Sequence, residues 1–164
     1  MLRASMNLTH LHLALNHIPV LGTAFGLALL IFGLWRKSNE LKKTALCTFV
    51  VIALMAVPAY LTGEPAEDGV EGLPGVSEAI IEQHEEAADV AFASVGALGV
   101  IALLGLLALR HGRSVPPWFA GLMVIASLTV SGLMGWTANI GGQIRHTEIR
   151  VGTASSPSIS KDRD

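Results

Sequence analysis

Four long runs of apolar residues, separated by short polar stretches, dominate the pattern of this chain. They predict four helices, over residues 8–36, 40–61, 77–111 and 117–139. The first run contains 18 uncharged residues, Ile18 to Trp35. As a helix it would extend about 27 Å, close to the thickness of the hydrocarbon core of a bilayer. The pattern predicts an all-α protein, with an integral membrane four-helix bundle over residues 8–150.

Polar or helix-breaking residues mark the limits of these helices. Residues 1–7 read as a short polar lead, and the serine-rich residues 151–164 as a disordered tail. The acidic segment 62–76 is expected to form a loop, since it contains several glycines and prolines. The sequence Asn139-Ile140-Gly141-Gly142 is expected to cap the fourth helix.

The composition agrees with a membrane protein and excludes several other classes. Hydrophobic residues make up 51% of the 164 residues and charged residues only 15%, whereas soluble domains carry roughly 25% charged residues. No basic cluster with interleaved aromatic residues indicates nucleic-acid binding. No motif for nucleotide binding, covalent haem attachment or a serine nucleophile is present. No residue is assigned as catalytic, and whether the chain is an enzyme stays open.

The distribution of basic residues predicts an orientation. The connections after the first and third helices carry six of them, Arg36, Lys37, Lys42, Lys43, Arg110 and Arg113. The connection after the second helix carries none and is acidic. The positive-inside rule places the basic connections in the cytoplasm. Both termini and the acidic loop then lie on the outer side, which for a bacterial inner membrane is the periplasm.

Histidines concentrate on that outer side. Five of the six fall there, namely His10, His12, His17, His84 and His146. At 100° per residue, His12 lies toward the same side as Gly22 and Gly26, and His84 lies opposite an acidic stripe. Both are therefore expected to face the bundle. Gly22 and Gly26 form a GxxxG motif, which predicts close approach of another helix and suggests a homodimer.

Several segments resemble a known group of proteins. The motif His12-x4-His17-Ile18-Pro19 is similar to the H-x4-H-[FIL]-P opening of a family of bacterial four-helix membrane proteins of unknown function. The segments at 58–67, 73–88 and 139–150 resemble a narrower set of bacterial proteins of similar length. This resemblance covers about residues 7–150. It implies a bacterial membrane protein and suggests haem binding by His12, His17, His84 and His146.

Two classes of function follow from the histidines, because ionisable groups near membrane depth are costly and are usually functional. In the first, the protein is a b-type haem electron-transfer unit, with His12 or His17 and His84 as axial ligands, serving a respiratory or redox partner. In the second, it is a non-catalytic membrane subunit, assembly factor or metal-binding protein; the metal site would be one transition-metal ion held by the four histidines, with Glu64 or Glu67 as a further ligand. A third possibility is a structural or proton-relay role, in which the histidines bond backbone, water or the acidic loop. The residues expected to support such a site are Asn16, Glu64, Glu67, Glu85 and Arg145.

Overall fold

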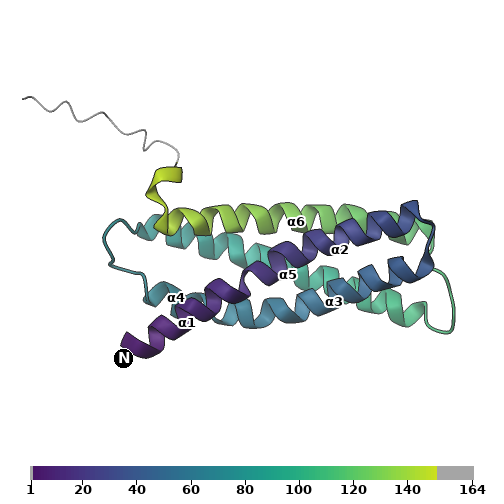
Figure 1. Cartoon of the computed structure of the whole chain (residues 1–164), viewed down its shortest axis with the longest axis horizontal. Coiled ribbons are helices and arrows are strands. Elements are labelled where there is room, and N and C mark those ends of the chain that lie inside the picture. The colour runs from purple at the N-terminus through teal and green to yellow at the C-terminus, as the bar shows by residue number, and fades with distance from the viewer. Residues whose placement is uncertain (1, 151–164) are drawn as a thin grey trace, which may run out of the picture.

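The computed structural model describes residues 2–150, with side chains from residue 8 onward. The predicted tail, 151–164, lies outside the described residues. Within residues 2–150 the chain forms helices and turns only. The helices are α1 (Leu2–Leu15), α2 (His17–Trp35), α3 (Asn39–Leu61), α4 (Gly63–Asp68), α5 (Glu78–Ala108), α6 (Pro117–Arg145) and the 3-10 turn η1 (Thr147–Ile149). In Figure 1, α2, α3, α5 and α6 run lengthwise through one bundle, and α1 lies at the end where α4 and η1 are found.

Four segments are long and apolar enough to cross a membrane. They are Leu8–Trp35, Asn39–Leu61, Glu78–Ala108 and Pro117–Arg145. Large apolar side chains also point outward on each, including Leu21, Phe25, Leu54, Leu104 and Ile125. A soluble protein rarely exposes so much contiguous apolar surface. These four segments suggest a multi-pass membrane protein.

The first helix differs from its prediction in two respects. It begins at Leu2 rather than at residue 8, and Asn16 divides it into α1 and α2. The break precedes Pro19, which has no backbone N–H to donate to the carbonyl of Leu15. The backbone N–H of Asn16 still donates to the carbonyl of His12 at 2.9 Å. The chain therefore bends at this point without unwinding far.

The predicted cap at residues 139–142 is wrong. Helix α6 continues through Gly141 and Gly142 to Arg145. The third predicted helix, in contrast, ends at Ala108 rather than at residue 111. There His111 and Gly112 adopt positive φ angles of 65° and 80°, which reverse the chain. The acidic loop contains the short helix α4, which the density of glycine and proline in that segment did not indicate.

The core lies along the bundle axis and is apolar. Its largest fully buried apolar side chains are Leu30, Leu46, Phe49, Val95, Val115 and Met123. Gly22 and Gly26 of α2 lie against α3, where an added Cβ atom would come within 2.2 Å of Ile52 and 2.6 Å of Phe49. The close approach predicted by the GxxxG motif therefore occurs inside the monomer. Helix α3 covers the face that carries Gly22 and Gly26, and the homodimer stays a prediction.

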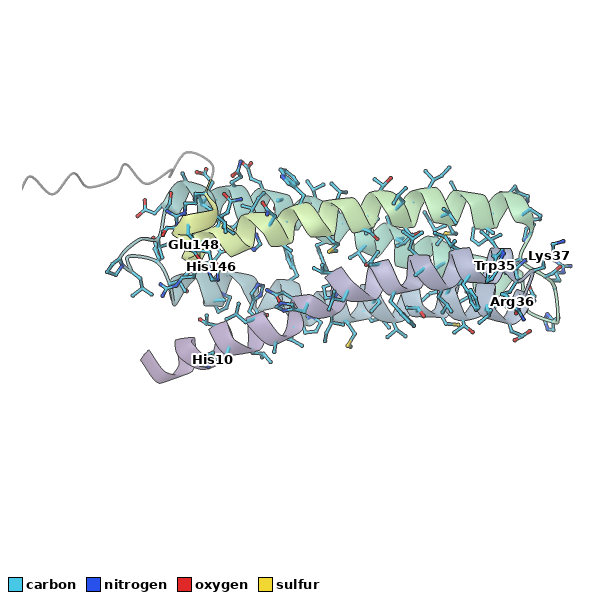
Figure 2. All side chains as sticks on the ribbon, turned by 45° about the horizontal axis from the view of Figure 1, so that its top comes forward. His10, Trp35, Arg36, Lys37, His146 and Glu148 are labelled. Atoms are coloured by element: carbon cyan, nitrogen blue, oxygen red, sulfur yellow. The ribbon has the colours of Figure 1, made fainter. Side chains whose placement is uncertain are left out.

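The connections at the basic end are tied together. The backbone N–H of Val115 donates to Oδ1 of Asn39 at 2.8 Å, and Nζ of Lys42 donates to the carbonyl of Val115 at 3.2 Å. Figure 2 shows Trp35, Arg36 and Lys37 at this end, and His10, His146 and Glu148 at the opposite end. The bundle therefore has one basic end and one end that carries histidines and acids.

Candidate histidine site

Two histidines from different helices point into the histidine-bearing end of the bundle. His12, on α1, places Nδ1 3.0 Å from the carbonyl oxygen of Ala59 and 3.3 Å from the hydroxyl of Thr62. His84, on α5, places Nδ1 3.1 Å from the carbonyl oxygen of Thr137 on α6. Both side chains are half-buried. The predicted inward orientation of these two histidines is confirmed.

These contacts determine which ring nitrogen carries the proton. A carbonyl oxygen only accepts hydrogen bonds, so Nδ1 of each neutral ring must be the protonated nitrogen. Nε2 of each ring is then left with a free lone pair. The histidine-bearing end of the bundle therefore holds two oriented imidazoles, each with a free Nε2.

Glycines lie beside both rings. A Cβ atom added at Gly63 would lie 3.7 Å from Cε1 of His12, an ordinary contact distance. A Cβ added at Gly141 would lie 2.8 Å from Cε1 and 3.3 Å from Nε2 of His84, which is too close for a real side chain. Gly141 thus allows α6 to pack directly on the imidazole. This explains a glycine within a continuing helix.

The other two predicted ligands lie elsewhere. His17 is exposed, and its Nδ1 contacts the carbonyl of Leu13 in the preceding turn at 2.8 Å. His146 is exposed and pairs with the carboxylate of Glu148 at 2.8 Å. Among the residues that the structure describes, no three His, Cys, Asp or Glu side chains are grouped to hold a metal ion. The structure therefore brings together His12 and His84, and the predicted set of four histidine ligands is not formed.

The predicted supporting residues do not contact the two rings in the way expected. Asn16 has a buried Oδ1 atom without a hydrogen-bond partner, whereas the His12 ring is oriented by α3. Glu64 and Arg145 are exposed. The groups that orient the rings are main-chain carbonyls and the hydroxyl of Thr62, which the sequence analysis missed. Every residue has a main-chain carbonyl, so a sequence cannot show which carbonyl bonds a histidine. Only the hydroxyl of Thr62 could have been predicted.

Glu67 and Glu85, also predicted to support the site, form a pair with each other. Glu67 lies half-buried on α4 and shares a hydrogen bond with Glu85 on α5. Burial, this hydrogen bond and the negative charges of Glu85, Glu64 and Asp68 raise the pKa of Glu67 to about 8. Two carboxyl groups that share a hydrogen bond must hold a proton between them. At neutral pH that proton links α4 to α5.

We expect stability to fall as this proton is lost. The pKa of Glu67 in the folded state, about 8, is above its unfolded value of 4.5. The stabilisation is therefore complete below about pH 4.5, declines as the pH rises, and is gone above about pH 8. Melting temperatures of detergent-solubilised protein between pH 5 and 9 measure this decline.

Glu67→Gln keeps the hydrogen bond without the titration and should flatten the dependence on pH. Glu82→Gln, at an exposed position of α5 whose charge is not among those that raise the pKa of Glu67, is the control and should keep the dependence of the wild type. An unchanged slope in Glu67→Gln would mean that the pair does not hold the proton.

Comparisons with protein-family models, with curated proteins and with solved structures found no match to this chain. Its function is therefore inferred from the geometry of its own residues.

Proposed function

We propose that this protein is a multi-pass protein of the bacterial inner membrane that binds one transition-metal ion through Nε2 of His12 and Nε2 of His84. One observation carries the proposal: in both rings Nδ1 is bonded to a main-chain carbonyl. Histidine ligands of metals almost always donate their other ring N–H in this way, which fixes the tautomer and aims Nε2 at the ion. Neutral imidazole suits zinc, copper, iron and nickel.

The packing around His84 argues against haem as the bound group. An axial histidine needs open space around Nε2, because the porphyrin plane extends to all sides of the iron. A Cβ atom at Gly141 would already lie 3.3 Å from that nitrogen. Helix α6 therefore occupies volume that a porphyrin would need. A single ion, about 2 Å from each nitrogen, requires far less room.

Two protein ligands leave part of the coordination shell open. Water, a small ligand or a side chain of a partner protein would complete it. Such a site suits a subunit, an assembly factor or a metal-handling protein better than an enzyme acting alone. A respiratory or other redox complex at the outer face is the kind of partner that we propose.

Charge and aromatic residues support the orientation that we propose, with the histidine site toward the periplasm. Arg36 and Lys37 lie at the end opposite to His10 and His146 (Figure 2). Trp35 and Trp118, at the basic end, are 74% and 71% exposed. Tryptophans at the level of the headgroups are typical of membrane-spanning helices.

Metal analysis and an absorption spectrum of purified protein test the proposal. Wild-type protein, expressed with haem, zinc, copper and iron supplied, should contain about one ion per chain and no Soret band. His12→Ala and His84→Ala should each lose the ion. His10→Ala and His17→Ala are matched controls at exposed positions and should retain it. A metal-free wild-type protein, or a Soret band lost in His84→Ala, would overturn the proposal.

A second candidate role rests on the same two hydrogen bonds. His12 ties α1 to α3, and His84 ties α5 to α6. Without metal, the histidines would act as polar links between membrane helices. In that case His84→Ala lowers the melting temperature of a protein that contains no metal, whereas the metal role predicts that a chelator lowers the stability of the wild type.

A further inference from the structure

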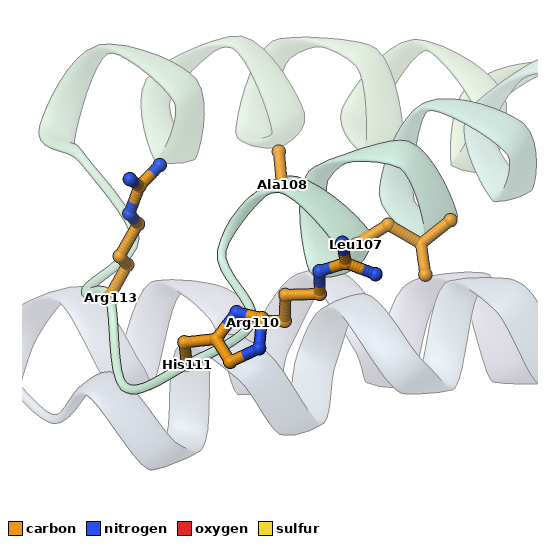
Figure 3. Close-up of a pocket in the computed structure, with 5 residues that line it drawn as sticks. All are labelled: Leu107, Ala108, Arg110, His111 and Arg113. Carbon is orange, nitrogen blue, oxygen red and sulfur yellow. The ribbon is translucent and has the colours of Figure 1, made fainter.

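A cavity of about 330 Å³ opens at the basic end of the bundle, opposite to the end that carries the histidine site (Figure 2). It is lined by Leu107, Ala108, Arg110, His111 and Arg113 (Figure 3). The two apolar residues belong to the end of α5, and the three polar ones belong to the turn that follows it. The positive φ angles of His111 and Gly112 reverse the chain there, so that Arg110 and Arg113 lie on opposite limbs of the turn (Figure 3).

The lining of this cavity is positively charged and lacks any acid. The salt bridge found among residues 8–150 joins His146 to Glu148, so neither arginine of the cavity is paired with a carboxylate. The connections at this end contain six lysines and arginines and a single acid, Glu40. The carbonyls at the end of α5 stabilise cations nearby. The two guanidinium groups are therefore charged and free to bind an anion.

The composition of the cavity matches one kind of anion. Arginine binds phosphate oxygens through two parallel hydrogen bonds, a geometry that chloride does not offer. Leu107, 51% exposed, supplies an apolar wall on the side that continues along α5. A ligand with a phosphate group and an adjoining hydrocarbon chain would contact both parts.

The position of the cavity agrees with this ligand. Trp118 lies in the first turn of the next helix, α6, at the same end and is 71% exposed, as expected for an aromatic residue at headgroup level. Basic pockets beside membrane-spanning helices on the cytoplasmic side bind phospholipid headgroups. We infer that the turn at the end of α5, with Arg110 and Arg113 on its opposite limbs, binds the phosphate-containing headgroups of anionic phospholipids. The inference depends on the proposed membrane insertion and not on the metal site.

The experiment compares two double variants that remove the same charge from the same end. Protein in nanodiscs of phosphatidylcholine with increasing phosphatidylglycerol is analysed by native mass spectrometry for retained lipid. R110Q/R113Q should reduce the retention of phosphatidylglycerol about tenfold, since each juxtamembrane cation contributes substantially to binding anionic lipid. R36Q/K37Q removes the same charge at two exposed positions outside the cavity, so it loses only the general attraction to the anionic surface and should reduce retention clearly less than R110Q/R113Q.

Three results would overturn the inference. An equal loss in both double variants would mean that the whole basic end attracts lipid without a built site. Binding of inorganic phosphate without any preference for phosphatidylglycerol would assign the cavity to a free anion instead of a lipid. Failure of the wild-type protein to enter nanodiscs would overturn membrane insertion itself, and this result is distinct from the other two.

Discussion

Gly99→Ala should destabilise the bundle by roughly 1–3 kcal/mol, although alanine is the better helix former. Gly99 is buried on α5 where this helix meets α3. An added Cβ atom would lie 2.3 Å from Cβ of Ala53 and 3.4 Å from the carbonyl oxygen of Phe49. Alanine has no rotamer that could move away. The two helices must therefore separate, and the apolar contacts on both sides are lost.

Gly96→Ala, three residues earlier on the same helix, is the matched control. A Cβ atom at Gly96 meets nothing within 4 Å. Only the helix propensity then changes, which favours alanine by about 0.5–1 kcal/mol. The stability of each variant in detergent, followed by circular dichroism during thermal or denaturant unfolding, measures the difference.

A compensating change tests whether the contact itself is responsible. Ala53→Gly in the Gly99→Ala background removes the opposing methyl group and should recover most of the loss, giving a coupling energy of at least about 1 kcal/mol. Equal stability of Gly99→Ala and Gly96→Ala would mean that α3 and α5 do not approach as closely as the structure has them.

The sequence predicted the helices better than their ends. Four apolar runs bounded by charges indicate four helices, and the polar residues after Trp35 end α2 where expected. The pair Gly141-Gly142 is typical of a helix cap, and yet α6 continues through it. Gly141 is required because the ring of His84, on α5, packs directly against it. The two residues are 57 positions apart in the sequence, so no local pattern can reveal this contact.

The same distinction between local and distant information applies to the site. The periodicity of α1 and α5 was sufficient to place His12 and His84 on inward faces. It could not show that their partners are main-chain carbonyls of α3 and α6. The GxxxG motif likewise shows that some helix approaches Gly22 and Gly26, and it does not identify which one. In this structure it is α3 of the same chain, through Ile52 and Phe49.

Gly141→Val should disrupt the histidine site without removing a ligand. The new Cβ atom would lie 2.8 Å from Cε1 and 3.2 Å from Nδ1 of His84. The half-buried ring must then swing away, which breaks its hydrogen bond to Thr137. A lost hydrogen bond costs about 1 kcal/mol, and overpacking typically adds about 1–3 kcal/mol. We therefore expect a loss of roughly 2–4 kcal/mol in the free energy of unfolding.

Gly135→Val is the control for this variant, because it places the same β-branched residue at an exposed position of α6 with nothing within 4 Å. Unfolding in detergent should show Gly141→Val to be the less stable of the two, and metal analysis should show that it does not bind the ion that we propose. Combining it with His84→Ala separates packing from other effects, since removal of the ring creates space for the valine. The double variant should then be at least as stable as Gly141→Val alone. If the losses of the two single variants instead add up in the double variant, His84 and Gly141 are not in contact. The orientation of the His84 ring would then not be the one described, and the metal proposal, which depends on that orientation, would fail.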